Sequence, residues 1–295
     1  MTSFRTESLA GNISEQRQKR ALQRSRTLGA LPAASTAEDA ANDPRLAEAL
    51  QRIVQARRDG EGKVNLSRMA LARLPGELCL ATKLHTLHVQ QNDLTALPAA
   101  IGQLVSLQTL DAGSNKLTAL PATKPGQLGS LQRLHVQNNK LRTLPSTIGT
   151  LGALEELHAS INELAALPDA IGQLGSLQTL SVACNQITAL PAAIGQLGSL
   201  RILDVYSNLL SSLPHEVGQL GSLQTLVVHS NKLTALPIEI GLLGSLRTLN
   251  VHSNQLVALP SEIGGLGSLQ TLMVFNNRLV GLPASMHQLA ALMTL

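Results

Sequence analysis

The sequence repeats one motif of about 23 residues, LxxLxVxxNxLxxLPxxIGxLGS, nine times between Leu84 and Ala291. The copies begin at Leu84, Leu107, Leu131, Leu154, Leu177, Leu200, Leu223, Leu246 and Leu269. A fixed period of this length is typical of a solenoid, in which every repeat forms one coil. A single coil cannot enclose its own leucines, so they pack against the leucines of neighbouring coils. The period therefore predicts a stack of coils around one continuous aliphatic core.

Each copy divides into a strand and a return segment. The LxxLxV part predicts a short strand, and successive coils would pair these strands into a parallel sheet on the concave side. The Leu-Pro pair that follows ends the regular hydrogen bonding because Pro has no N–H. The Ile-Gly pair allows a tight backbone path on the convex side. The predicted fold is an α/β solenoid, a horseshoe with a parallel concave β-sheet, an N-terminal capping helix and no C-terminal cap.

One asparagine recurs at the same position of every copy. The members of this asparagine ladder are Asn92, Asn115, Asn139, Asn162, Asn185, Asn208, Asn231, Asn254 and Asn277. An amide offers both donors and acceptors, so each side chain can satisfy backbone groups where the strand turns out of the sheet. We therefore expect nine buried asparagines that serve folding rather than function.

The chain begins with a segment that cannot build a core. Residues 1–42 contain nine Ser/Thr and no sustained hydrophobic period, which predicts a disordered arm. Five basic residues lie between Arg17 and Arg26. They form either a solvated tail or a functional patch, such as an address signal, a nuclear-import patch or a contact for an acidic surface.

A capping helix and a degenerate repeat follow. Residues 43–60 predict the helix, with Asp43 as N-cap and Pro44 at the first helical position. Its expected apolar face consists of Leu46, Leu50, Ile53 and Val54. Residues 61–83 keep the repeat pattern, but Met69 replaces the asparagine. Together these two segments would shield the first edge of the stack.

Residues 84–291 form the nine repeats, and the pattern is broken at two places, one within this array and one after it. In the second copy, PAAIGQL becomes PATKPGQL at residues 121–128, which inserts one residue and removes the Ile. We expect a local bulge and looser packing there. The tenth copy is a truncated repeat, residues 292–295. An open strand edge favours pairing with another chain. We therefore expect a protein partner or a second copy, as in a homodimer, to cover the edge from Leu292 to Leu295, or the chain to be a piece of a longer product.

Composition limits the classes of function. No apolar run approaches the ~18 residues of a membrane span, and residues 1–35 lack the apolar segment of a secretory signal peptide. Cys79 and Cys184 are the only cysteines, which favours a reducing compartment. The net charge of +4 comes from residues 1–83, which carry +5, whereas residues 84–295 carry −1. The repeats therefore lack the clustered basic face that nucleic-acid binding needs.

The candidate protein-binding site lies on the outward side of the predicted strands, because the core does not dictate those residues. Two columns, with one residue per coil in each, make up this candidate site. The candidate residues are His88, Asp111, His135, His158, Asp204, Tyr206, Val227, His229, Asn250, His252, Met273 and Phe275. The face is polar and rich in histidine in the first four coils and more apolar from Tyr206 onwards.

Five histidines in these columns allow three interpretations. A metal site needs three or four converging ligands, and no Cys or trio of carboxylates completes either the pair His135 and His158 or the pair His229 and His252. A pH-sensitive contact surface is compatible with the titration of His near neutrality. The third interpretation, polar contacts on a protein-binding face, is the one we adopt, and we predict no metal.

Two of the three aromatic residues, Tyr206 and Phe275, lie in the same columns. Aromatic side chains are enriched among the residues that dominate binding energy at interfaces. They are therefore candidate anchors for a partner, although the same rings could simply fill gaps between strands. The sequence shows no nucleophile elbow, phosphate-binding loop or acid-base carboxylate pair. We accordingly predict a protein that is not an enzyme and has no cofactor.

The repeat LPxxIGxLGSLQTLxVxxNxLTALP closely resembles the intracellular 23-residue class of leucine-rich repeats over residues 61–295. This class is shared by Ras-group scaffold proteins and by bacterial effectors delivered into plant cells. The Ser/Thr/Gln/Arg-rich arm resembles a type III secretion signal, and Arg outnumbers Lys 16 to 7, as in GC-rich genomes. The resemblance implies a protein-binding module.

Three functions follow from this resemblance. The first is a bacterial type III effector that passes from the bacterial cytoplasm into the host cell cytoplasm and binds a host protein there. The second is the substrate-recognition part of a ubiquitin-ligase effector whose catalytic domain is missing or on another chain. The third is a cytoplasmic signalling scaffold of the Ras-group type.

Overall fold

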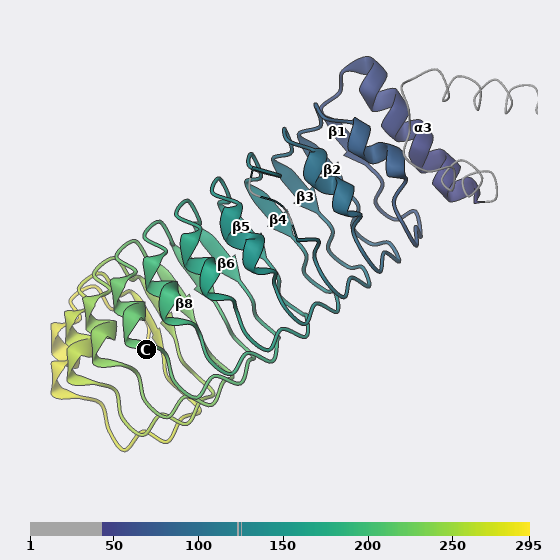
Figure 1. Ribbon diagram of the computed structural model, residues 1–295. Helices are drawn as coiled ribbons and strands as arrows, with labels where there is room; N and C mark the ends of the chain where they lie inside the picture. Colours follow the sequence, from purple (N-terminus) through teal and green to yellow (C-terminus); the bar gives the residue numbers. More distant parts are fainter. Residues whose placement is uncertain (1–42, 123, 125) are drawn as a thin grey trace, which may run out of the picture. The chain divides into compact units, whose positions relative to one another are not determined.

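The computed structural model describes residues 43–122, 124 and 126–295. The arm expected at residues 1–42 lies outside the described residues. Residues 49–295 form one compact unit, a stack of coils in sequence order (Figure 1). This arrangement confirms the predicted solenoid.

Ten parallel strands of three residues each form one sheet, in the order β1 to β10. The strands are β1 (Lys63–Asn65), β2 (Thr86–His88), β3 (Thr109–Asp111), β4 (Arg133–His135), β5 (Glu156–His158), β6 (Thr179–Ser181), β7 (Ile202–Asp204), β8 (Thr225–Val227), β9 (Thr248–Asn250) and β10 (Thr271–Met273). The middle residue of each strand points into the core, and its two neighbours point outward, because side chains alternate along a strand. Equivalent residues pair between strands, as in Leu87 with Leu110. Each repeat position therefore becomes a straight column across the sheet.

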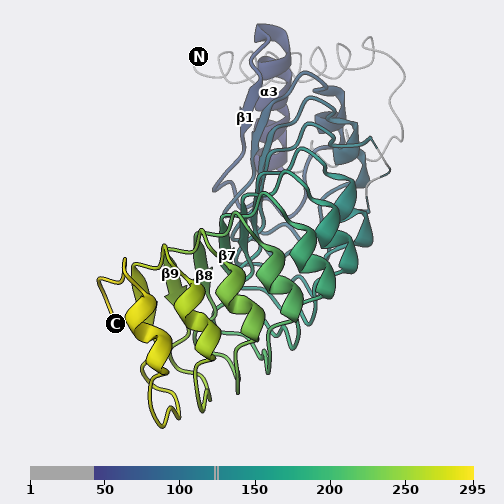
Figure 2. The same cartoon turned by 90° about the vertical axis from the view of Figure 1, so that its left-hand side faces the viewer.

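The return segments carry short 3-10 helices on the side of the coils away from the strands (Figure 2). They are η1 (Gly76–Leu80), η2 (Ala99–Gln103), η3 (Ser146–Thr150), η4 (Asp169–Gln173), η5 (Ala192–Gln196), η6 (His215–Gln219), η7 (Ile238–Leu242), η8 (Ser261–Gly265) and η9 (Ala284–Gln288). Each follows the proline of the Leu-Pro pair, whose extended backbone turns the chain into the helix, as at Pro98 with φ −64° and ψ 140°. The glycine of the Ile-Gly pair is needed for close approach of coils. A Cβ atom at Gly172 would lie 2.4 Å from the carbonyl oxygen of Ala193 in the next coil.

The α-helix α3 (Pro44–Asp59) precedes the first coil. The Asp43 carboxylate accepts a hydrogen bond from the Arg45 N–H (2.9 Å), as expected for an N-cap. The buried residues of α3 include Ala49, Ile53 and Ala56, whereas Leu50 and Val54 are only half-buried. The predicted apolar face was therefore wrong in part, since small alanines lie at its centre. No helix in the described part of the chain, α3 included, is long and apolar enough to cross a membrane.

The asparagine ladder ties each coil to the preceding one, as Asn185 illustrates. Its Oδ1 accepts a hydrogen bond from the Leu164 N–H of the preceding coil (2.9 Å). Its Nδ2 donates to the carbonyl oxygens of Ala159 (3.1 Å) in that coil and Val182 (2.9 Å) in its own. The predicted role is confirmed, but the predicted burial is only partly right. Six of the nine are buried, and the other three, Asn139, Asn162 and Asn277, are half-buried.

The second repeat differs from the others, as its altered sequence predicts. In its described residues a turn at 126–130, with Gly126 at φ +85°, stands where the other repeats have a five-residue 3-10 helix. A cavity of about 30 Å³ lies beside it, and its lining includes Ile101, Leu128 and Ile148. The missing Ile side chain leaves this space unfilled.

Residues 292–295 add a single bridge to the sheet, between Thr294 and Thr271. The Leu272 N–H donates to the Thr294 carbonyl oxygen (2.9 Å). Large apolar side chains in the last coils are exposed, including Val280 (97%) and Met293 (80%).

Candidate functional site

The outward side chains of the sheet form three columns, which we call the strand face. The first column is Lys63, Thr86, Thr109, Arg133, Glu156, Thr179, Ile202, Thr225, Thr248 and Thr271. The other two, which contain all the predicted site residues, start at Asn65 and at Ser67. No residue of the first column was among the predicted site residues, although the alternation of side chains along a strand places this column on the same face.

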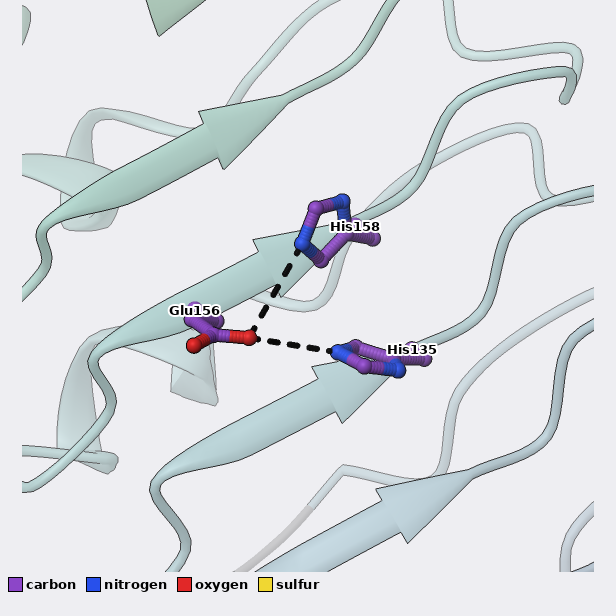
Figure 3. A group of neighbouring side chains, drawn as sticks. All are labelled: His135, Glu156 and His158. Carbon is purple, nitrogen blue, oxygen red and sulfur yellow. Dashed lines mark ion pairs between the residues drawn. The ribbon is translucent and has the colours of Figure 1, made fainter. Parts of the chain in front are cut away.

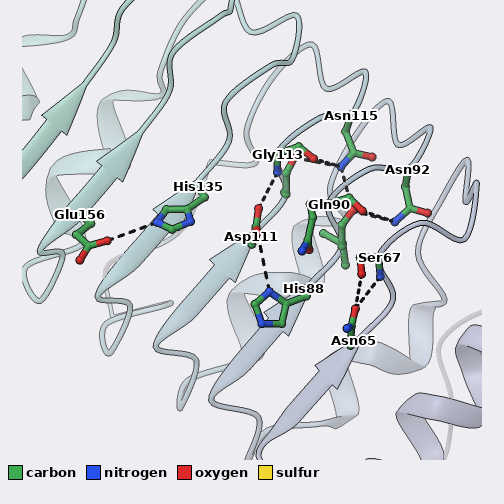
Figure 4. Close-up of polar contacts among 12 residues, drawn as sticks. Asn65, Ser67, His88, Gln90, Asn92, Asp111, Gly113, Asn115, His135 and Glu156 are labelled. Carbon is green, nitrogen blue, oxygen red and sulfur yellow. Dashed lines mark hydrogen bonds and ion pairs between the residues drawn. The ribbon is translucent and has the colours of Figure 1, made fainter. Parts of the chain in front are cut away.

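Polar contacts occupy the first coils of the strand face (Figure 4). The His88 Nδ1 lies 3.9 Å from a carboxylate oxygen of Asp111. The other Asp111 oxygen accepts a hydrogen bond from the Gly113 N–H (3.1 Å). In the coil before, the Asn65 Oδ1 accepts hydrogen bonds from the N–H (3.0 Å) and hydroxyl (2.6 Å) of Ser67. These side chains are held in place by neighbours within or next to their own coil.

Two predicted histidines and one unpredicted glutamate converge on β4 and β5 (Figure 3). One carboxylate oxygen of Glu156 lies 3.5 Å from the Nε2 of His135 and 4.0 Å from the Nε2 of His158. The two imidazole rings meet edge to face, with centroids 4.8 Å apart. Burial and then repulsion from His135 lower the pKa of His158 below its ordinary 6.5, against the opposing effects of Glu156 and Asp204. This cluster was not predicted, because Glu156 belongs to the first column, which contains none of the predicted site residues.

A second polar contact lies on β6 and β7. The Ser181 hydroxyl donates to a carboxylate oxygen of Asp204 (3.1 Å) and also contacts the Ser160 hydroxyl (2.8 Å). Burial raises the pKa of Asp204 above its ordinary 3.8, although hydrogen bonds from the Tyr206 N–H and from Ser181 act in the opposite direction. Asp204 is thus a partly desolvated carboxylate beside the aromatic part of the face.

Four rings form a continuous stack in the third column, through Tyr206, His229, His252 and Phe275. Successive ring centroids are 4.7, 4.2 and 4.3 Å apart, and the interplanar angles are 14°, 14° and 10°. The spacing is close to the ~4.8 Å between neighbouring strands, so pairing in register places ring on ring. The sequence placed these residues in one column, and the structure shows that they stack.

Hydrogen bonds hold the rings of the stack in orientation. The Nδ1 atoms of His229 and His252 lie 3.0 and 2.9 Å from the hydroxyl oxygens of Ser230 and Ser253. Hydrogen bonding with the Cys184 thiol is the largest of the effects that raise the pKa of Tyr206. Burial and then repulsion from His252 lower the pKa of His229 below 6.5.

The remaining predicted residues surround the stack. Val227, Asn250 and Met273 lie in the neighbouring column and are half-buried. Phe275 is 57% exposed and ends the stack with a large apolar surface. Tyr206, a predicted anchor, is half-buried because the His229 ring covers one side of it. The part of the strand face from Tyr206 to Phe275 is therefore a pre-formed aromatic surface with a partly desolvated carboxylate, Asp204, at its edge.

Two family models match the chain. A leucine-rich repeat region matches residues 75–164, and a leucine-rich repeat model matches residues 175–233 and 221–279. Among proteins with curated annotation, none matches the sequence.

Several solved structures have the same fold. The leucine-rich-repeat protein LIC12759 of Leptospira interrogans is 37% identical with a TM-score of 0.74, and the match covers 85% of this chain and 68% of that one. YopM from Yersinia enterocolitica is 32% identical with a TM-score of 0.63, and the match covers 80% of this chain and 47% of that one. The plant peptide hormone receptor RGFR1, in complex with RGF2, is 25% identical with a TM-score of 0.54, and the match covers 75% of this chain and 44% of that one. The repeats, the sheet and these matches agree, and the chain belongs to the leucine-rich-repeat family.

Proposed function

We propose that the chain is a non-enzymatic protein-interaction module that binds its partner on the strand face. The observation that carries the proposal is the ring stack from Tyr206 to Phe275. Its rings are already ordered by one another and by hydrogen bonds, so binding would cost little side-chain entropy. Rigid aromatic surfaces of this kind commonly supply the strongest contacts at protein interfaces.

We infer further that the partner is a host protein and the chain a bacterial type III effector, transferred from the bacterial cytoplasm to that of the host cell. Three observations support this. The repeats resemble those of effectors delivered into plant cells, and the composition of residues 1–42 resembles a type III secretion signal. Both LIC12759 and YopM, to which the chain is similar, are bacterial proteins.

The binding proposal is tested with a pair of matched variants. Tyr206→Ala with Phe275→Ala removes two side chains of the stack, whereas Ile238→Ala with Leu242→Ala removes two exposed apolar side chains of η7 on the other side of the coils. Each purified variant is used to capture proteins from a host-cell lysate, and the captured proteins are quantified by mass spectrometry. We expect the stack variant to lose the main wild-type partner by more than about tenfold, the effect of 1.4 kcal/mol. The η7 variant should capture it normally.

Equal capture by the stack variant and the wild type would refute the binding site. The effector proposal is tested separately, by fusing residues 1–50 to a translocation reporter in a bacterium with a type III system. Delivery that requires this system is expected. Retention of the reporter in the bacterium would contradict the effector role and favour a cytoplasmic scaffold.

A further inference from the structure

The cluster of His135, Glu156 and His158 has the composition of a transition-metal site. Imidazole nitrogens and carboxylate oxygens are common ligands of zinc, and the set of two His and one Glu occurs in zinc sites that keep one coordination position open. The three ligand atoms lie within 4.8 Å of one another. We propose that these residues bind a divalent metal ion of the zinc type on the strand face.

The distances between the ligand atoms support this proposal. Ligands about 2.0–2.1 Å from a tetrahedral zinc ion lie roughly 3.3–3.5 Å from each other. The two histidine Nε2 atoms are 3.5 and 4.0 Å from the same Glu156 oxygen. The remaining adjustment is therefore on the order of an ångström, which small rotations of the side chains can supply without moving the backbone.

The Nε2 of His135 provides a second observation. It is inaccessible to solvent and has no hydrogen-bond partner among the residues that the structure describes. A buried polar atom without a partner is unfavourable, and a bound ion or water molecule is one of the explanations for such an atom in a native structure. The nitrogen points toward the Glu156 carboxylate (Figure 3), so an ion held between the two would satisfy both groups.

The backbone around the cluster keeps these ligands in place. β4 and β5 pair in register, with His135 opposite His158, and the Val136 N–H donates to the His158 carbonyl oxygen (2.8 Å). The side chains of His135, Glu156 and His158 are 26%, 38% and 37% exposed, so the site is accessible from the strand face. With three ligands from the chain, the fourth position is available to water or to a group from a bound partner.

The surrounding charges are mixed, which indicates a site that binds a cation with modest affinity. Asp111 pairs with His135 in register and adds a negative charge on one side. Arg133 pairs with Glu156 and opposes the binding of a cation. The other histidine pair, His229 with His252, offers no such site, because its rings stack face to face and both Nδ1 atoms contact serine hydroxyls. That pair is therefore a matched control for loss of two surface imidazoles.

The test is a competition titration of the full chain, purified without a polyhistidine tag, with Zn²⁺ and a chromophoric chelator. Three variants are compared with the wild type: His135→Ala/His158→Ala, Glu156→Gln, and the control His229→Ala/His252→Ala. We expect the first to weaken Zn²⁺ binding by more than the roughly 10- to 100-fold typical of losing an outer-shell partner, because two direct ligands are lost. The Glu156→Gln variant should lose about tenfold or more, and the control should stay within about threefold.

Spectroscopy gives an independent reading. Co²⁺ bound in place of Zn²⁺ should show the visible absorption of a four-coordinate site in the wild type and the control, and lose it in the His135→Ala/His158→Ala variant. Circular dichroism checks that each variant is folded, and His135→Gln/His158→Gln replaces the alanine variant if that variant is not. Absence of Zn²⁺ binding to the wild type, or equal losses in the cluster and control variants, would overturn the proposal. The outcome is separate from partner capture, which is measured without added metal.

Discussion

The asparagine ladder predicts a large loss of stability when one of its central members is removed. In Asn185→Ala the Leu164 N–H loses its hydrogen bond in a buried region. The carbonyl oxygens that Asn185 contacts keep other donors, since Ala159 also accepts from Asn162 and Val182 from Asn208. The main cost is therefore the orphaned N–H, at about 1–3 kcal/mol, with roughly another 1 kcal/mol from the weaker carbonyl bonds.

We expect Asn185→Ala to lower the free energy of unfolding by about 2–4 kcal/mol in urea titrations followed by circular dichroism. The matched control is Asn277→Ala in the ninth repeat. Asn277 makes the same pattern of bonds, to Leu256, Val251 and Val274, but is itself half-buried. Water can replace its bonds, so the expected cost is about 1 kcal/mol or less. Equal losses in the two variants would refute the reasoning, because burial would then not set the cost.

Two further predictions concern close packing and pH. Gly172→Ala should lower the free energy of unfolding by about 1–3 kcal/mol, because the new Cβ would overlap a backbone oxygen of the next coil. The control Gly175→Ala, whose Cβ would have no atom within 4 Å, should change it by less than about 0.5 kcal/mol. Urea titrations of both variants measure these changes, and equal effects would contradict the prediction. The pKa of His229 is lower in the folded chain than its ordinary 6.5, so this imidazole takes up a proton more readily in the unfolded chain. The free energy of unfolding should therefore be highest above pH 6.5 and decrease as the pH falls below 6.5. His229→Gln should reduce the change in the free energy of unfolding between about pH 7.5 and about pH 5.5, measured by urea titrations at each pH. An unchanged pH dependence would rule out His229 as its source.

The repeat made the fold predictable because the same residue types recur at the same positions in every coil. Leu87 and its equivalents specify the core, and Asn92 and its equivalents specify the bonds between coils. The one altered repeat was also readable, since the missing Ile at residues 121–128 predicts the gap beside Leu128. The face of α3 was predicted less well, because alanines such as Ala49 carry little hydrophobic signal and yet allow the closest packing.

The backbone conformation within each coil could not be predicted from the sequence in the same way. The residue before each ladder asparagine adopts a positive φ, and at Ile161 the value is +56°. A β-branched residue rarely adopts this conformation. Its side-chain type gives no sign of the turn, because closure of the coil and the bonds of Asn162 impose it.

The sequence by itself determined the solenoid, the columns of the strand face and the membership of His135, Tyr206 and Phe275 in those columns. The reason is that a fixed period and in-register pairing place equivalent residues of successive repeats side by side. Only the tertiary structure decided how the side chains within these columns meet. Rotamers and the strand spacing stack the four rings from Tyr206 to Phe275, and they bring Glu156 to His135 and His158. A repeat pattern contains no information on those side-chain rotations, since they depend on the neighbours that each residue meets in the adjacent coils.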